Sequence, residues 1–263
     1  MRLKDKVILV TGSTTGIGEG MVRMFAEQGA CVIVHGTRES AAREVVTGIE
    51  AKGGRAAYVI GDLSDPAVPA RVVAGAIQRG GGRLDSIVNN AAWVIRSSLE
   101  TTDLATWDRT MAINLRAPFL IIQAVLPHFR QQGGGKIINI GSCNAYCGER
   151  NQFVYSVSKG GLMTLTRNIA DAHGAEGIRV HQFNVGWVLT PNEYALKIKE
   201  GLPENWPEKL PRVHAPAGRI MTPEDVGWAA IYFLSDEAPL VNGSVVDFDQ
   251  YPLIGRNFTK ATV

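Results

Sequence analysis

Short β-branched runs alternate with stretches of helical periodicity along the whole chain. The first run, residues 7–10, precedes a stretch in which Ile17, Met21, Met24 and Phe25 share one helix face. Alternation of this kind implies parallel strands joined by right-handed helical crossovers. We therefore predict an α/β fold, a doubly wound parallel sheet in three αβα layers. Its strands are expected at residues 7–10, 31–34, 56–60, 84–88, 136–140, 179–183 and 245–248.

The alternation continues through all 263 residues without a linker or a repeat. This predicts one domain that spans residues 1–263. The only long stretch without a periodic pattern is 191–217, which is rich in Pro and contains Trp206. A loop of that length inside a compact domain usually has a function, so we expect a substrate lid there. A helix should begin just after it, at a typical start signature of Thr222, Pro223, Glu224 and Asp225.

Charged residues are balanced and interspersed. The chain has 27 basic and 25 acidic residues, with a formal net charge of +2 and no block of like charge. This pattern disfavours nucleic acid and anionic membrane surfaces as partners and favours a small-molecule ligand. The first apolar run is only four residues long, far shorter than a secretion signal or a membrane span requires. We therefore expect a cytoplasmic protein.

The cysteines and histidines have no spacing typical of a metal or redox site. Cys31, Cys143 and Cys147 cannot all pair and form no C-x-x-C motif, so we interpret them as reduced thiols. Cys143 is more readily a packing residue than a nucleophile. The five histidines show no ligand spacing either, and no metal site is predicted.

A glycine-rich turn connects the first predicted strand to the first predicted helix. It reads TGSTTGIG over residues 11–18. Glycines permit a tight turn and a close approach of the backbone to a pyrophosphate, which binds at the N-terminus of the following helix. In this strand–turn–helix context the motif predicts a dinucleotide site in a Rossmann-type fold, with an ordinary tight turn as the alternative.

Tyr155 and Lys159 lie four residues apart at the start of another predicted helix, so they share one face. Taken alone, such a pair usually belongs to a solvated surface. Ser142, however, follows the predicted strand 136–140 at its carboxyl end, the edge at which open α/β sheets bind ligands. A nearby ammonium would also help to lower the pKa of a tyrosine, ordinarily about 10, toward neutrality. Together the three residues favour a catalytic site.

These residues resemble, in order and spacing, those of the classical short-chain dehydrogenases/reductases, and the resemblance covers nearly the whole chain. It implies hydride transfer between NAD(P)(H) and a secondary alcohol or ketone. Tyr155 would be the general acid/base, Ser142 would polarise the carbonyl, and Lys159 would anchor the ribose and lower the tyrosine pKa. Asn114 would organise a proton-relay water. The resemblance also implies a homo-oligomer, either a tetramer or a dimer.

The resemblance implies a set of cofactor-binding residues as well. The glycine turn would hold the phosphates and ribose, the residues after the third strand the adenine, and those after the fourth strand the nicotinamide ribose. A later segment would orient the carboxamide. With Tyr155 and Lys159, these residues are Gly12, Thr14, Gly16, Ile17, Gly18, Asp62, Leu63, Asn89, Ala91, Val188 and Thr190.

Three positions depart from the family pattern. Ala92 replaces a glycine at the end of the motif that begins at Asn89, which is a small change. Val185 replaces the proline that normally precedes Gly186, so the nicotinamide loop could differ in shape. The sequence DFDQY at 247–251 replaces Asp-Gly-Gly, which puts the local turn and a subunit contact in question.

The residues after the second predicted strand favour NADP over NAD. His35, Gly36, Thr37 and Arg38 include no carboxylate that could bind the ribose hydroxyls. Arg38 can instead pair with a 2′-phosphate through its planar guanidinium. A solvated turn arginine is the alternative, and Thr15 stands where many NADP-dependent relatives carry a basic residue.

The predicted substrate pocket combines aromatic faces with hydrogen-bonding groups. Trp187 could line it or belong to the core, and the same holds for Trp206. A mixed pocket of this kind suits a small polyhydroxylated substrate, a sugar or polyol, better than a steroid or acyl chain. Solvent exposure of most of these side chains is the alternative. The candidates are Trp93, Arg96, Asn144, Glu149, Asn151, Trp187, Asn192 and Glu193.

Two other functions are compatible with the fold. A nucleotide-binding sensor or scaffold could have kept the fold and lost the chemistry, but such a protein would commonly lack part of the set formed by Asn114, Ser142, Tyr155 and Lys159. A dehalogenase-like lyase should lack an intact dinucleotide turn and carry Arg at position 159. The sequence therefore favours an oxidoreductase.

Overall fold

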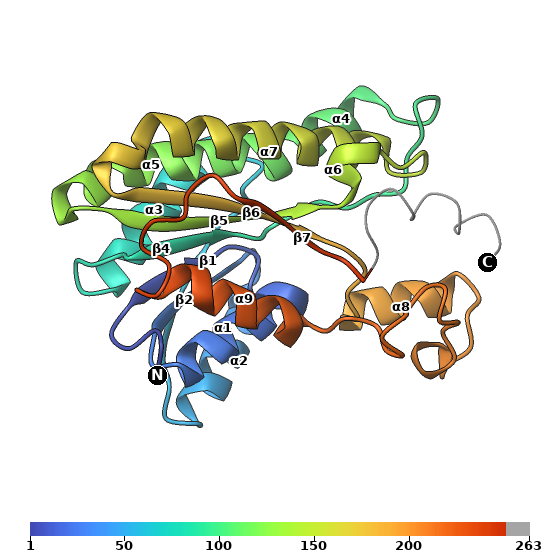
Figure 1. Cartoon of the computed structure of the whole chain (residues 1–263), viewed down its shortest axis with the longest axis horizontal. Coiled ribbons are helices and arrows are strands. Elements are labelled where there is room, and N and C mark those ends of the chain that lie inside the picture. Colours follow the sequence, from blue (N-terminus) through green and yellow to red (C-terminus); the bar gives the residue numbers. More distant parts are fainter. Residues whose placement is uncertain (251–263) are drawn as a thin grey trace.

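A seven-stranded parallel sheet forms the centre of the molecule (Figure 1). The structure is a computed structural model that describes residues 1–250. The strand order is β3-β2-β1-β4-β5-β6-β7, so the chain reverses its direction of travel across the sheet between β3 and β4. The strands are β1 (Val7–Val10), β2 (Cys31–Gly36), β3 (Arg55–Ile60), β4 (Ser86–Asn89), β5 (Gly135–Ser142), β6 (Ile178–Val185) and β7 (Val245–Phe248).

Helices cover both faces of the sheet. On one face, α1 (Gly16–Glu27), α2 (Glu39–Glu50) and α9 (Pro223–Leu234) enclose an apolar core. On the other, α3 (Val68–Arg79), α5 (Ala117–Gln132) and α7 (Phe153–His173) enclose a second. The remaining helical segments are α4 (Leu104–Met111), a π-helical turn (Ala112–Arg116), α6 (Asn144–Cys147), α8 (Pro191–Lys199) and 3-10 turns at Gly174–Glu176 and Trp206–Glu208.

The predicted doubly wound sheet is confirmed. All seven predicted strands are present, and β1 and β7 have the predicted bounds. The long central strands β5 and β6 extend two residues beyond the predicted carboxyl ends, because Gly141, Ser142, Asn184 and Val185 continue the pairing. Gly141, Ser142 and Asn184 are polar or small, so the apolar pattern used for the prediction ended too early.

The segment 191–217 is not irregular throughout, so that part of the prediction was wrong. Its first nine residues form α8, whose N-cap Thr190 accepts a hydrogen bond from the backbone N–H of Glu193 (3.1 Å). Pro191 occupies the first turn, as Pro223 does in α9. The start signature recognised at Thr222, which forms a capping box, was therefore also present at Thr190. The polar stripe of α8 concealed it, because none of its residues is buried.

α4, the π-helical turn and α5 form one continuous helical run, Leu104–Gln132. By length and hydropathy it could cross a membrane. Half of its most apolar window is buried within the fold, as in the core helix of a soluble protein, so the run is weak support for a membrane span.

Candidate active site

The glycine-rich turn packs tightly against the segment that follows β4. Gly12 has a left-handed backbone (φ +61°), and a Cβ there would lie 2.8 Å from the Cα of Ala91. Asn90 joins the two segments, because its side-chain amide donates to the carbonyls of Thr11 (2.9 Å) and Gly12 (3.0 Å). A Cβ on Gly18 would lie 2.5 Å from the same amide nitrogen. Larger side chains are therefore excluded at both glycines.

The N-terminus of α1 follows this turn with its first backbone N–H groups unsatisfied within the helix. The helix begins at Gly16, and its N-cap Thr15 makes no side-chain capping bond. Ile17 and Gly18 lie in the same first turn. Free N–H groups and the positive end of the helix dipole suit a bound anion. The turn therefore fits a dinucleotide pyrophosphate.

His35 fixes the glycine turn from the β2 side. Its buried ring accepts a hydrogen bond at Nδ1 from the backbone N–H of Gly12 (3.2 Å), and Nε2 lies 3.1 Å from the carbonyl of Gly61. Since a carbonyl can only accept, Nε2 carries the proton and the ring is neutral. Burial lowers the pKa of His35 to about 4, which keeps this tautomer at physiological pH. The His35 side chain thus connects the end of β2 with the glycine turn after β1 and with the residue that follows β3.

The candidate adenosine residues lie at the ends of β2 and β3. Arg38 is the exposed residue just before α2 and makes no ion pair with the residues described. Asp62 accepts a hydrogen bond from the backbone N–H of Ser64 (2.9 Å), which lowers its pKa, and Leu63 is buried.

The end of β2 also packs against the glycine turn. A Cβ on Gly36 would lie 2.6 Å from the methyl group of Thr14, so a larger residue at this position would displace Thr14.

Ser142, Tyr155 and Lys159 meet at the carboxyl edge of the sheet. Ser142 is the last residue of β5, and the other two lie one turn apart near the start of α7, which packs on β5 and β6. The Ser142 hydroxyl lies close enough to the Tyr155 side chain to act on the tyrosine pKa. The Lys159 ammonium lies 5.5 Å from the centre of the Tyr155 ring and donates to the carbonyl of Ile140 (2.7 Å). The structure therefore brings the predicted catalytic trio together.

Burial controls protonation in this trio. It raises the pKa of Tyr155 to about 12, and the Ser142 hydroxyl acts in the opposite direction. Burial also lowers the pKa of Lys159 to about 8. The protein's own groups thus favour a neutral phenol, and further positive charge is needed for Tyr155 to lose its proton near neutrality.

Asn114 lies in the π-helical turn between α4 and α5. Its side chain makes three hydrogen bonds: Oδ1 accepts from the backbone N–H of Trp93 (2.7 Å), and Nδ2 donates to the Trp93 carbonyl and to Ser158 Oγ (both 3.1 Å). The side chain thus holds the segment after β4 against α7. π-helical turns disturb the regular hydrogen-bond ladder and are frequent at functional sites.

Buried amides form a polar network beneath α7. Asn89 Nδ2 donates to Asn139 Oδ1 (2.8 Å), and Asn139 Nδ2 donates to Thr166 Oγ1 (2.9 Å). Asn89 Oδ1 is buried and has no protein partner among the residues described. On β6, Gln182 Nε2 donates to Asn184 Oδ1 (2.7 Å). The candidate ribose residue Asn89 is therefore oriented by this network, with one acceptor still available.

The residues just before α8 lie over the glycine turn. Thr190 is 3.6 Å from where a Cβ on Gly16 would be, and the buried Val188 pairs with Met221. Trp187 stacks on Trp206 with ring centres 5.4 Å apart and an interplanar angle of 11°. Trp206 is only 2% exposed, so it belongs to the core and does not line an open pocket.

The candidate substrate residues fall into three groups. Trp93 is partly exposed beneath the guanidinium of Arg109 (4.5 Å to the ring centre), and Asn144 is buried with its backbone N–H 3.2 Å from Ser142 Oγ. Three other candidates are engaged in side-chain hydrogen bonds. Trp187 donates to Glu193, which is itself a candidate (2.6 Å), and Arg96 donates to Glu200 (3.3 Å). The remaining three are Glu149, which is half-buried, and Asn151 and Asn192, which are exposed.

Gln152 was missed by the sequence analysis. Its Oε1 accepts a hydrogen bond from Asn144 Nδ2 (2.7 Å), and the backbone N–H of Asn144 in turn donates to Ser142 Oγ (3.2 Å). Gln152 is also the residue just before α7 and three positions before Tyr155. That spacing places it one helical turn from the tyrosine, a signal that was available in the sequence.

The positions that depart from the family pattern are accommodated locally. Val185 is buried at the end of β6 and pairs with Ser142. Asp247 accepts from Asn184 Nδ2 (3.0 Å), and Gln250 Nε2 donates to the carbonyl of Arg219 (2.8 Å), so the chain after β7 contacts the segment just before α9. Ala92 is exposed. Residue 251 lies outside the described residues.

Known proteins were compared with the chain. A family model described as enoyl-(acyl carrier protein) reductase matches residues 12–250. An uncharacterized oxidoreductase of Thermotoga maritima is 34% identical over 249 residues, 95% of this chain and 98% of that protein. The crystal structure of a 3-ketoacyl-(acyl-carrier-protein) reductase from Brucella melitensis complexed with NADH has a TM-score of 0.82 at 28% identity, covering 94% and 98%. That of L-sorbose reductase from Gluconobacter frateurii, complexed with NADPH and L-sorbose, has a TM-score of 0.88 at 26% identity, covering 96% and 99%.

Proposed function

Because the chain belongs to the short-chain dehydrogenase/reductase family, we propose that Ser142, Tyr155 and Lys159 catalyse its oxidoreductase reaction at the carboxyl edge of the sheet. The enzyme transfers a hydride between NAD(P)(H) and the CH–OH group of a substrate. The observation that carries the residue assignment is the meeting of these three side chains beside the glycine-rich dinucleotide turn. This arrangement also favours an enzyme over a non-catalytic nucleotide sensor.

A bound nicotinamide supplies the hydride in reduction and accepts it in oxidation. In reduction, Tyr155 donates its hydroxyl proton to the carbonyl oxygen, so that the C=O group becomes CH–OH and a phenolate remains. Ser142 donates a hydrogen bond to the same oxygen and stabilises the charge that develops there. In oxidation the phenolate removes the proton from the alcohol.

Lys159 and Asn114 support this proton transfer. The Lys159 ammonium, held by the carbonyl of Ile140, stabilises the phenolate and can donate to a cofactor ribose. The side chain of Asn114 is committed to Trp93 and Ser158. We therefore assign the organisation of a relay water to the irregular backbone of its π-helical turn.

NADP is the preferred cofactor in this proposal. Arg38 is an exposed cation at the end of β2 without an ion-pair partner in the described part of the chain, and it can bind a 2′-phosphate. Arg38→Ala should lower kcat/KM for NADP by about tenfold or more, and leave that for NAD nearly unchanged. Equal kcat/KM values for both cofactors in both proteins would refute the role of Arg38.

The substrate in this proposal is a small polyhydroxylated molecule, a sugar or polyol. Asn144, whose backbone N–H donates to Ser142 Oγ, and Gln152, which is hydrogen-bonded to the Asn144 side chain, carry amides that can bind substrate hydroxyls. An acyl chain would leave these buried groups unpaired, at a cost of about 1–3 kcal/mol each. L-sorbose reductase, a structural neighbour, carries such a substrate.

A single-domain, cytoplasmic homo-oligomer completes the proposal. The segment 191–217 serves as the substrate lid, tied across the site by the Arg96–Glu200 ion pair (3.3 Å). A surface groove of about 850 Å³ between α4, α5 and α7 contains the partly exposed Phe119, and it supports self-association. Phe119→Asp should shift the assembly toward the monomer, as measured by light scattering.

The experiment that tests the function follows reduced nicotinamide by its absorbance. The purified protein is supplied with NAD or NADP and a panel of polyols, aldoses, simple secondary alcohols, steroids and hydroxyacyl thioesters. We expect turnover, with the highest kcat/KM among the sugars and polyols. A kcat/KM for a steroid or acyl thioester well above every sugar and polyol would overturn the substrate class, and no turnover with any alcohol would overturn the oxidoreductase.

A further inference from the structure

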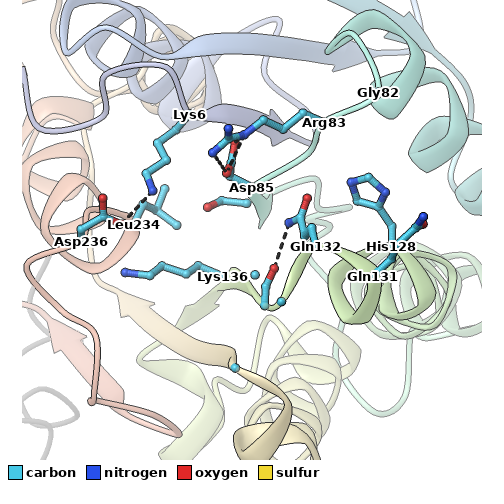
Figure 2. Close-up of a pocket in the computed structure, with 15 residues that line it drawn as sticks. Lys6, Gly82, Arg83, Asp85, His128, Gln131, Gln132, Lys136, Leu234 and Asp236 are labelled. Carbon is cyan, nitrogen blue, oxygen red and sulfur yellow. Dashed lines mark hydrogen bonds and ion pairs between the residues drawn. The ribbon is translucent and has the colours of Figure 1, made fainter.

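A second pocket lies at the opposite, amino edge of the sheet. It has a volume of about 660 Å³ and opens between the starts of β1, β4 and β5 and the ends of α5 and α9. This size is within the range of small-molecule sites. Three cationic side chains, Lys6, Arg83 and Lys136, and two carboxylates, Asp85 and Asp236, line it. Figure 2 shows Lys6, Lys136 and Asp236 on the same side of the pocket, with Arg83 beside Asp85.

The cations keep hydrogen-bond donors that the protein does not use. Lys136 donates to the carbonyls of Ser235 and Ala238 at the end of α9, which accounts for two of its three N–H groups. Arg83 donates to Asp85 through Nε and Nη2, and Nη1 has no partner among the described residues. Unused donors of like charge around one cavity are suited to an anion.

Lys136 is the least neutralised of these cations. It forms no ion pair with the described residues, although its side chain is partly buried. Burial lowers its pKa, and the nearby charges of Lys6 and Arg179 act in the same direction, while Asp236 opposes them. An anion bound beside Lys136 would relieve this like-charge repulsion.

The two carboxylates differ in how firmly they are held. Asp85 accepts the backbone N–H of Val7 (2.7 Å) as well as the Arg83 guanidinium, and its side chain is 14% exposed. Among residues 1–250, Asp236 forms a side-chain hydrogen bond with Lys6 alone (2.7 Å), and its side chain is 81% exposed. An exposed ion pair contributes at most about 1 kcal/mol, so a ligand can displace Asp236 at little cost. Without it, the pocket presents three cations and one carboxylate.

We propose that this amino-edge pocket binds the phosphate group of a small phosphorylated molecule. The dianion would sit between Lys6 and Lys136 in place of Asp236, with Arg83 at its edge. The net positive charge of two that remains matches a phosphate monoester. The volume leaves room for an organic group, which the amides of Gln131 and Gln132 can face. The site is remote from Tyr155, so its ligand is not the substrate.

The test is calorimetric titration of the full-length protein with inorganic phosphate and with glycerol 3-phosphate at constant ionic strength. Saturating oxidised cofactor is present, so that phosphate cannot occupy the dinucleotide turn. We expect saturable binding, tighter for glycerol 3-phosphate if the pocket takes a phosphate monoester. Equal affinities would assign the site to free phosphate, and the absence of saturable heat with either probe would overturn the proposal.

Variants locate the binding. Lys136→Gln should weaken it on the order of tenfold. Lys6→Gln should weaken it by a similar factor, and it is the second variant because it leaves the contacts of Lys136 with the end of α9 in place. Asp236→Asn should strengthen binding, because it removes the competing carboxylate. Lys52→Gln is the matched control, since Lys52 also forms an exposed ion pair, with Glu27, away from the pocket. Equal affinities in Lys6→Gln, Lys136→Gln and Lys52→Gln would contradict the assignment.

Discussion

The two edges of the sheet hold polar side chains in different ways. At the carboxyl edge, His35, Asn89, Asn114 and Lys159 are buried, and each is fixed by hydrogen bonds to backbone or amide groups. At the amino edge, the contact between Lys6 and Asp236 is an exposed ion pair. Buried networks orient groups and shift their pKa values, whereas exposed pairs do little of either. The carboxyl edge is thus organised for chemistry, and the amino edge keeps an ion pair whose exposed carboxylate, Asp236, a ligand can displace.

The largest stability effect should come from the buried histidine of the carboxyl edge. The pKa of His35 is lowered to about 4 in the folded protein, against about 6.5 when unfolded. The unfolded state therefore binds more protons between these values, and stability is lost as the pH falls from 6.5 toward 4. The loss should reach about 2–3 kcal/mol by pH 4.5.

His35→Gln removes this titration. Urea unfolding at a series of pH values should show a variant that is less stable at pH 7 but loses less stability than the wild type on acidification. Parallel curves for the two proteins between pH 7 and 4.5 would show that His35 is not the group responsible.

A smaller loss of unfolding free energy is expected when a methyl group is added to the buried amide network of β5 and β6. Gly141 lies between the Lys159 anchor Ile140 and Ser142, and a Cβ there would be 2.4 Å from Asn184 Oδ1 and 2.5 Å from Gln182 Nε2. Gly141→Ala should cost about 1–3 kcal/mol of unfolding free energy. It should also lower kcat, because Ser142 and the Ile140 carbonyl that holds Lys159 would both move.

Gly160→Ala is the matched control for that substitution. Gly160 lies within α7, where the nearest atom to a new Cβ is 3.4 Å away, and alanine favours a helix. Unfolding free energies from urea titrations should therefore separate the two variants. Equal destabilisation by both would contradict the close packing at Gly141.

The smallest change in unfolding free energy is expected for a substitution at the amino edge. Asp236→Asn breaks the exposed pair with Lys6 and should change the unfolding free energy by less than about 1 kcal/mol. The change should shrink further at high salt, because exposed charges are screened. A loss of several kcal/mol in the urea titration would show that this edge is held as firmly as the other.

Local patterns explain what the sequence could predict. Alternating apolar runs located every strand, and the glycine turn, Ser142, Tyr155 and Lys159 were all placed at the correct edge, because their positions follow from strand ends and helix spacing. α8 was missed because it buries no residue and has no apolar stripe. Two features depend on residues that are far apart in the sequence, so only the folded chain reveals them. They are the contacts of His35 with Gly12 and Gly61 and the lining of the amino-edge pocket.

The central claim is that Tyr155 moves the proton. Steady-state kinetics of Tyr155→Phe, with cofactor affinity measured in parallel by fluorescence titration, tests it most directly. The substitution removes one hydroxyl and little packing, so kcat should fall by about 10²–10⁴-fold while the cofactor Kd stays close to that of the wild type. A variant that binds cofactor normally and keeps a tenth or more of the wild-type kcat would contradict the account.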